Sequence, residues 1–208
     1  MIRVWSIAIV IVLTGSLLTG WAQQAKKKKV ERPQYVIEVF QKGKKLGDIV
    51  IELFPDVAPK HVRNFDSLVS IKFYDGTAFH RVIPGFMIQG GDPNSKNKPR
   101  HMWGYGDPSQ KRVPAEFSDV PHKRGIVSAA RGPDPNSATS QFFICVADAP
   151  WLDGKYTVFG RVLKGMDVAD KVANVPRDAR DNPIDKVEMK IRKLKPEEYI
   201  HPGRGQDK

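Results

Sequence analysis

Cysteine is almost absent from this chain of 208 residues. Its single cysteine, Cys145, excludes an intramolecular disulfide framework and any metal site made from a cysteine cluster. Cys145 lies in an apolar run at residues 141–146, which predicts a small buried hydrophobic residue. The fold therefore depends on an ordinary hydrophobic core, and the length is sufficient for one domain with appendages.

Acidic residues are also scarce. The chain has 23 Asp and Glu against 34 Lys and Arg, which gives a net charge of +11 and a pI near 9.7. The sequence lacks the repeated aromatic and basic interleaving of single-strand binders, and it has no zinc-finger or basic-zipper pattern. We therefore expect a solvated basic face and no specific nucleic-acid partner. Much of the excess charge lies in residues 26–29, Lys42, Lys44, Lys45, Lys186, Lys190, Arg192, Lys193 and Lys195.

Charged side chains are nearly missing from residues 1–25, where Arg3 is the one example. A short positive start, an apolar centre and small residues near the end are typical of a signal for export. We therefore expect an exported protein, periplasmic or secreted. The alternative is an uncleaved membrane anchor, because residues 4–25 are just long enough to span a bilayer. The lysines that follow would then keep the remaining domain in the cytoplasm.

The rest of the chain predicts many short strands and only two helices. A basic linker is expected at residues 26–33, one domain at 34–195 and a disordered tail at 196–208. This composition indicates a mainly β fold, and spacing alone leaves a barrel and a sandwich both open. We expect strands at 35–40, 47–54, 79–83, 86–90, 125–130, 141–146, 157–162 and 187–191, helices at 59–70 and 166–172, and a loop at 92–114. His61, on the first helix, is expected at the surface.

Residues 79–92 are the most informative stretch. They read as a strand, a Pro-Gly turn and a second apolar strand that ends in two glycines. Arg81 and Gln89 are the long polar donors among their apolar neighbours. An apolar surface with two convergent donors suits a small pocket that holds an apolar ring and a peptide carbonyl together. The competing interpretation is a barrel strand with an outward arginine.

This stretch, Phe-His-Arg-Val-Ile-Pro-Gly-Phe-Met-Ile-Gln-Gly-Gly-Asp, resembles the signature of the cyclophilin family of peptidyl-prolyl cis/trans isomerases. Two further blocks follow in the family's order, Ser-Gln-Phe-Phe-Ile at 140–144 and Trp-Leu-Asp-Gly-Lys at 151–155 with Val-Phe-Gly at 158–160. The resemblance extends from about Tyr35 to Leu194. It implies a closed eight-stranded antiparallel β-barrel capped by two α-helices, and isomerase activity on X–Pro peptide bonds.

The resemblance also implies roles for particular residues. Arg81 would donate to the prolyl nitrogen, and Gln89 would hold a backbone carbonyl of the substrate. Such a reaction needs no cofactor and no metal, because it only has to favour a twisted amide over its planar forms. The other implied site residues are Phe86, Met87, Phe143 and Leu152 around the ring, Ala130 and the main chain at Arg131 along the peptide, Gln141 and Trp151 beside the site, and Tyr156.

Three departures from the common family pattern concern the site. Tyr156 stands where many members have histidine, and Arg131 stands where many have asparagine. Tyr105, between two glycines, is bulkier than the residue commonly found there, and the loop at 131–139 is one residue longer. We expect activity to survive with altered substrate preference. Trp151 matches the type of cyclophilin that binds cyclosporin.

Two main interpretations of function remain from the sequence, and a third, a basic cyclophilin-like adaptor on an anionic polymer, rests only on the net charge. The first is a monomeric isomerase that acts on proline-containing polypeptides and assists the folding of exported proteins. The second is a cyclophilin-like module that binds proline-containing segments without catalysis. An intact Arg81 favours the first.

Overall fold

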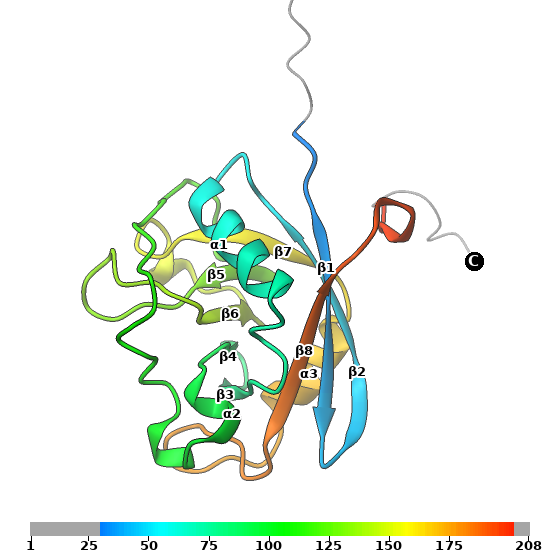
Figure 1. Ribbon diagram of the computed structural model, residues 1–208, viewed down its shortest axis with the longest axis vertical. Coiled ribbons are helices and arrows are strands. Elements are labelled where there is room, and N and C mark those ends of the chain that lie inside the picture. The colour runs from blue at the N-terminus through cyan, green and yellow to red at the C-terminus, as the bar shows by residue number, and fades with distance from the viewer. Residues whose placement is uncertain (1–29, 202–208) are drawn as a thin grey trace, which may run out of the picture.

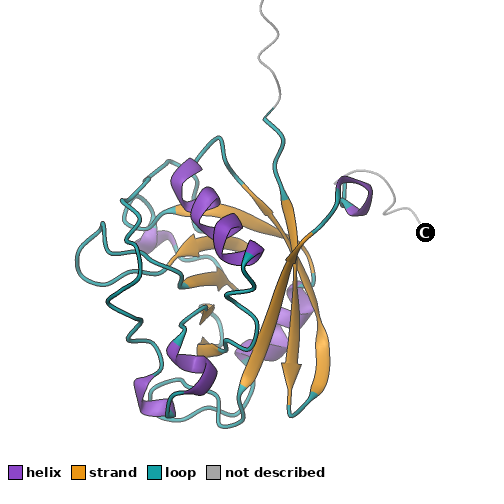
Figure 2. Ribbon diagram, viewed as in Figure 1, coloured by secondary structure: helices purple, strands orange, loops and turns teal. Residues whose placement is uncertain are grey.

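Eight antiparallel strands form a single curved sheet in the computed structural model, which describes residues 30–201 (Figures 1 and 2). The expected signal or anchor at residues 1–25 lies outside the described residues. The strands are β1 (Gln34–Gln41), β2 (Lys44–Leu53), β3 (Phe79–Ile83), β4 (Met87–Gly90), β5 (Ile126–Ala129), β6 (Phe142–Cys145), β7 (Val158–Lys164) and β8 (Val187–Lys193), in the spatial order β3-β4-β6-β5-β7-β2-β1-β8.

The sheet curls until its two edge strands approach each other. An isolated bridge pairs Ala78, just before β3, with Glu188 of β8. The Met189 amide also donates to the carbonyl of Thr77, at 2.9 Å. The predicted eight-stranded antiparallel barrel is confirmed, although it is nearly closed rather than fully closed, since β3 and β8 do not pair along their length.

The two predicted helices cover the barrel. Helix α1 (Pro59–Ser70) begins with proline, which is favoured at the first helical position, and α3 (Met166–Ala173) follows β7 directly. Both helices contribute to the main hydrophobic core cluster together with the inward-facing strand residues. Their buried core residues are Val62, Phe65 and Val69 in α1 and Val168, Ala169, Val172 and Ala173 in α3.

The expected loop at 92–114 contains short helical segments, namely α2 (Asn94–Asn97) and the 3₁₀ turn η1 (Arg100–Met102). The prediction of a structureless loop is therefore wrong for this part. Buried polar groups order this segment. The backbone N–H of Asn94 donates to Asp92 Oδ1 at 3.0 Å, and Ser95 Oγ donates to the backbone carbonyl of Asp92 at 2.5 Å. A segment ordered by hydrogen bonds leaves no apolar period in the sequence.

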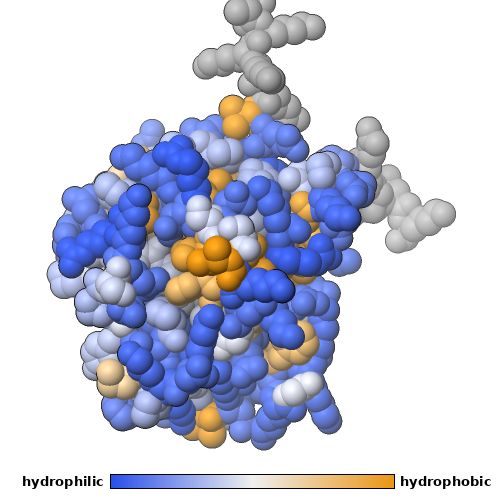
Figure 3. Space-filling view, viewed as in Figure 1, coloured by the Kyte–Doolittle hydropathy of each residue, from blue (hydrophilic) through white to orange (hydrophobic). Residues whose placement is uncertain are grey.

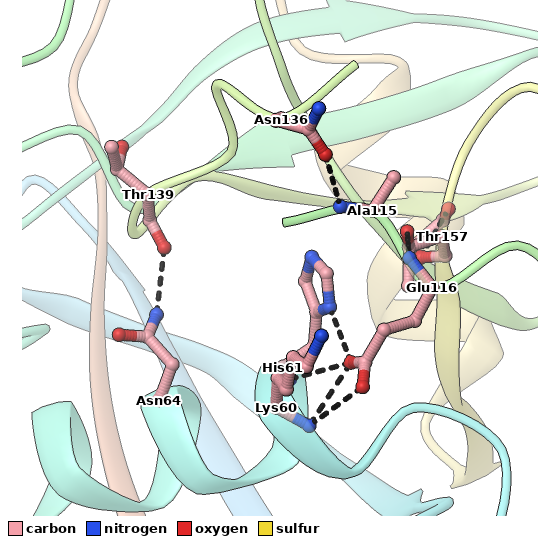
Figure 4. A network of polar contacts seen from close by, with 9 residues as sticks. Lys60, His61, Asn64, Ala115, Glu116, Asn136, Thr139 and Thr157 are labelled. Carbon is pink, nitrogen blue, oxygen red and sulfur yellow. Dashed lines mark hydrogen bonds and ion pairs between the residues drawn. The ribbon is translucent and has the colours of Figure 1, made fainter. Parts of the chain in front are cut away.

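His61 is buried at the start of α1, so the prediction that it lies on the surface is wrong. Glu116 explains the burial (Figure 4): its carboxylate accepts the backbone N–H groups of Lys60 and His61 and contacts His61 Nδ1 at 2.8 Å. Glu116 therefore caps a helix whose own N-cap side chain makes no such bond. Burial lowers the pKa of His61. The same contacts attach the long segment before β5 to α1.

Both ends of the domain extend further than predicted. Arg32, in the expected linker, donates to both carboxylate oxygens of Asp56, at 3.0 and 2.7 Å, and lies over the Phe54 ring. In the expected disordered tail, the 3₁₀ turn η3 (Pro196–Glu198) is ordered, and Tyr199 and Ile200 pack against a small cluster of Val36, Val50 and Leu194. The prediction of disorder is thus wrong for residues 196–201, and residues 202–208 lie outside the description.

Several basic side chains of the described chain form ion pairs with acids. Lys45 binds Glu38 and Asp48, and Lys193 binds Asp66 at 2.8 Å. The face in Figure 3 is accordingly hydrophilic over most of its area, with small separate apolar areas. Within residues 30–201, none of the helices has the length and apolar character that a bilayer crossing requires.

Candidate active site

The predicted site lies on the outer face of the barrel, across three neighbouring strands. Arg81 of β3 pairs directly with Gln89 of β4, and Gln89 pairs with Phe143 of β6. A bulge at His80 makes this possible. Phe79 pairs with Gly90 and faces the core, and after the extra residue Arg81 faces outward beside Gln89. The bulge therefore separates the core side chain from the polar donor within one short strand.

Next to these residues is a small pocket of about 110 Å³. Its floor belongs to a second hydrophobic cluster, separate from the barrel core, that includes Met87, Phe143 and Leu152. The pocket is thus apolar below and polar at its rim. Its lining residues are Arg81, Phe86, Met87, Gln89, Ala130, Arg131, Phe143, Leu152 and Tyr156. The structure brings together all of these sequence-predicted residues, whose roles in binding and catalysis remain predictions.

The two predicted donors differ in how they are held. Among the residues described, the Arg81 guanidinium has no hydrogen-bond or ion-pair partner, so its donors are free for a bound molecule. Gln89 Nε2 donates to Gln141 Oε1 at 3.1 Å and lies 3.5 Å from His80 Nε2. Burial lowers the pKa of His80, so this ring is neutral and adds no second charge beneath Gln89. Of the two arginines that line the pocket, Arg131 donates to backbone carbonyls, so Arg81 is the one whose donors have no partner within the described chain.

Gln141 lines a larger neighbouring groove of about 500 Å³ rather than the small pocket. Gln141 Nε2 donates to the carbonyl of Gly104 at 3.1 Å, and the Gly104 amide in turn donates to buried Asp92. These bonds fix the backbone on one side of Tyr105, whose side chain is 76% exposed at the groove. Tyr105, which the sequence marks as bulkier than the residue commonly found there, therefore lines this groove.

Trp151 lies beside the pocket without lining it. It belongs to the 3₁₀ turn η2 (Pro150–Leu152), is 55% exposed and packs on Phe86 with ring centroids 5.6 Å apart. Tyr156 lines the pocket and packs edge-on against Phe143, with ring centroids 5.9 Å apart. Each of these two aromatic rings therefore contacts a different lining residue, Phe86 or Phe143.

A network of hydrogen bonds under Phe143 is not predicted by the sequence. His122 Nδ1 lies 2.9 Å from Asp153 Oδ1, and His122 Nε2 lies 3.1 Å from Ser128 Oγ. The imidazole is stacked on the Phe143 ring at 6.1 Å. Hydrogen bonds from the backbone and ring of His122 lower the pKa of Asp153. Nothing in the periodicity marks His122, because its partners come from distant segments.

An apolar pocket with an unpartnered guanidinium at its rim, on the outside of an antiparallel barrel, suits the recognition of a proline ring next to an amide. The residues that line this pocket include no Ser, Cys, Thr, Asp or Glu, and they offer an apolar surface and hydrogen-bond donors for a bound peptide. The fold and the site together define the class, an antiparallel β-barrel with a pocket on its outer face. The model of the cyclophilin-type peptidyl-prolyl cis-trans isomerases matches residues 36–195, and the chain belongs to this family.

Relatives with this activity in their names support the assignment. The probable peptidyl-prolyl cis-trans isomerase of Brucella suis is 50% identical over 130 residues, which cover 61% of this chain and 66% of that protein, just under two thirds of its length. The peptidyl-prolyl cis-trans isomerase of Schizosaccharomyces pombe is 43% identical over 69% of this chain and 90% of its own. The Cryptosporidium parvum cyclophilin-type isomerase has a crystal structure that matches with a TM-score of 0.70 and 31% identity, over 79% of this chain and 99% of the other.

Proposed function

We propose that this protein accelerates the cis/trans rotation of X–Pro bonds in exported polypeptides and so assists their folding. The observation that carries the proposal is the Arg81 guanidinium, which has no partner among the described residues, at the rim of an apolar pocket of about 110 Å³. The structure of the Cryptosporidium parvum relative in the presence of the dipeptide Ala-Pro supports a proline-containing peptide as the occupant.

The chemistry follows from the amide bond. Rotation must break amide resonance, which sets a barrier of roughly 18–20 kcal/mol. In the twisted state the prolyl nitrogen regains its lone pair and becomes a hydrogen-bond acceptor. Arg81 would donate to that nitrogen, and this interaction is stronger in the transition state than in either planar form. The apolar residues Met87, Phe143 and Leu152 would hold the ring while the carbonyl side turns.

The test is the cis-to-trans rate of a short Ala-Pro peptide with the purified wild-type protein and with Arg81→Ala. We expect the variant to remain folded by circular dichroism and to lose activity by about 10²–10³-fold, as when a transition-state donor is removed. Arg63→Ala removes an exposed arginine of α1 and serves as the charge control, with wild-type activity expected. A wild-type protein that binds the peptide without changing the rate would instead favour the non-catalytic binding module.

The export part of the proposal is supported by the sequence of residues 1–25 and needs its own test. In the host cell, we expect the mass of the protein to show cleavage after Ala22 or Ala25 and the protein to be found outside the cytoplasm. An intact chain in the membrane fraction would favour the anchor at residues 4–25.

We also propose that the protein acts as a monomer and that a cyclosporin-type peptide would inhibit it through Trp151 and the pocket.

A further inference from the structure

Arg131 and Tyr156 touch each other at the rim of the small pocket. The guanidinium carbon of Arg131 lies 4.6 Å from the centroid of the Tyr156 ring. Both residues line the pocket, although Arg131 follows β5 and Tyr156 precedes β7. The implied role of Arg131 in peptide binding uses only its main chain. Its side chain therefore has a contact at the site that the proposed mechanism does not use.

The Arg131 side chain is fixed by backbone carbonyls on both sides. Its Nε and Nη2 atoms donate to the Lys155 carbonyl at 3.3 and 2.9 Å. Its Nη1 atom donates to the carbonyls of Gly132 and Pro133 at 2.9 and 3.2 Å. A planar guanidinium can make these bonds simultaneously, whereas the point charge of a lysine cannot. Arg131 thus joins the loop after β5 to the segment that carries Tyr156.

Tyr156 passes this contact on to the pocket. Its ring meets Phe143 edge-on, with centroids 5.9 Å apart and an interplanar angle of 81°. Phe143 is 5% exposed and is held from below by the His122 ring. The hydroxyl of Tyr156 makes no hydrogen bond within the described chain, so the position of the ring depends on Arg131 and Phe143. The three side chains form a continuous stack from the rim to the floor.

We propose that the side chain of Arg131 is a positioning residue that holds Tyr156 against Phe143 and so sets the width of the pocket for the proline ring. The inference rests on the proposed function, because it takes a proline ring as the occupant. The ring stays in the pocket in both planar forms and in the twisted form. An interaction that is equal in ground and transition states changes KM and leaves kcat unchanged, whereas Arg81 acts on kcat.

The experiment measures Kd, KM and kcat for an Ala-Pro peptide with Arg131→Ala, Arg131→Lys, Tyr156→Leu and Tyr156→Phe in the full chain. For Arg131→Ala we expect Kd and KM to rise about threefold to tenfold, with kcat within about twofold of the wild type. The rise reflects the loss of one cation–π contact and of the fixed position of the Tyr156 ring. Arg131→Lys should recover only part of the loss. Tyr156→Phe should raise KM less than Tyr156→Leu does, because the ring and not the hydroxyl carries the contact with Arg131. Arg63→Ala is the control for loss of an arginine charge.

A double-variant cycle decides whether Arg131 acts through Tyr156. If it does, Arg131→Ala combined with Tyr156→Leu raises KM no further than Tyr156→Leu alone. Additive effects would overturn the inference, and so would a loss in kcat as large as that of Arg81→Ala. If Arg131→Ala does not fold, Arg131→Lys replaces it in the cycle, and its KM is compared with that of Arg131→Lys combined with Tyr156→Leu. A wild-type protein that binds the peptide without accelerating rotation would refute the proposed catalysis and leave the Kd values to decide on Arg131. No peptide binding at all would overturn both.

Discussion

The two faces of β4 and β6 perform different tasks with the same alternation of residues. On the inner face, Ile88 and Ile144 are fully buried in the barrel core. On the outer face, Gln89 and Phe143 lie beside the pocket, and the apolar cluster there is completed by residues from outside these two strands. The inner face requires apolar side chains of about the right volume. The outer face requires in addition that distant segments arrive at defined positions.

The inner face therefore determines mainly the stability of the fold, and the outer face determines mainly the specificity of the site. Inner side chains contact one another across the barrel and are separated from water. Outer side chains meet groups such as the Arg131 guanidinium, which depends on carbonyls of two different segments. Damage to the inner face should therefore appear as lower stability, and damage to the outer face as weaker activity in a protein that still folds.

Ile144→Ala should give the largest change in stability. The residue is 0% exposed in the core cluster, and truncation of a buried isoleucine costs about 2–5 kcal/mol of the free energy of unfolding. Chemical denaturation followed by circular dichroism measures this. We expect kcat/KM per folded molecule to remain within about twofold of the wild type. Lost activity with unchanged stability would contradict the division between the two faces.

Gln89→Ala tests the outer face of the same sheet, where we expect an effect on activity rather than on stability. Gln89 is half-buried and donates to Gln141, and its predicted role is to hold a peptide carbonyl. Loss of one such hydrogen bond should reduce kcat/KM by about threefold to tenfold, equivalent to roughly 1 kcal/mol. The unfolding free energy should change by less than about 1 kcal/mol, because water can solvate the vacated rim. A stability loss comparable with that of Ile144→Ala would show that the outer face also holds the barrel together.

Much of this division could be predicted from the sequence. Strand alternation and the Pro-Gly turn predict two paired strands in residues 79–92, with Arg81 and Gln89 as donors on an apolar surface. The apolar period of residues 59–70 predicts α1 within its observed bounds. These signals are local, because a strand or helix repeats its buried face at a fixed interval. The resemblance to the cyclophilins supplied the choice of a barrel, which spacing alone left open.

The contacts that position the site are not local, and the sequence does not reveal them. His122 reaches Asp153 and Ser128 from another segment, and Glu116 reaches the start of α1 across 55 positions. The resemblance implies a role only for the main chain of Arg131, because no pattern in the sequence indicates that its side chain would cross to the Lys155 carbonyl. Each of these contacts is a hydrogen bond between segments that only the tertiary fold brings together.

Acidification should lower the stability by a smaller amount, through protonation of the buried His61. Burial lowers the pKa of His61, although contact with Glu116 opposes the shift. Because Nε2 is buried without a partner, a proton there would have nothing to bond.

A lowered folded-state pKa means that the unfolded chain binds the proton first, so stability is full above about pH 6.5, the ordinary pKa of histidine, and declines below it. We expect the thermal midpoint of the wild type to fall between pH 7 and pH 5, and to fall less in His61→Gln. His80 also has a lowered pKa and is unchanged in this variant, so its contribution cancels between the two proteins. If the thermal midpoint falls equally with pH in both proteins, protonation of His61 is not a source of the acid sensitivity.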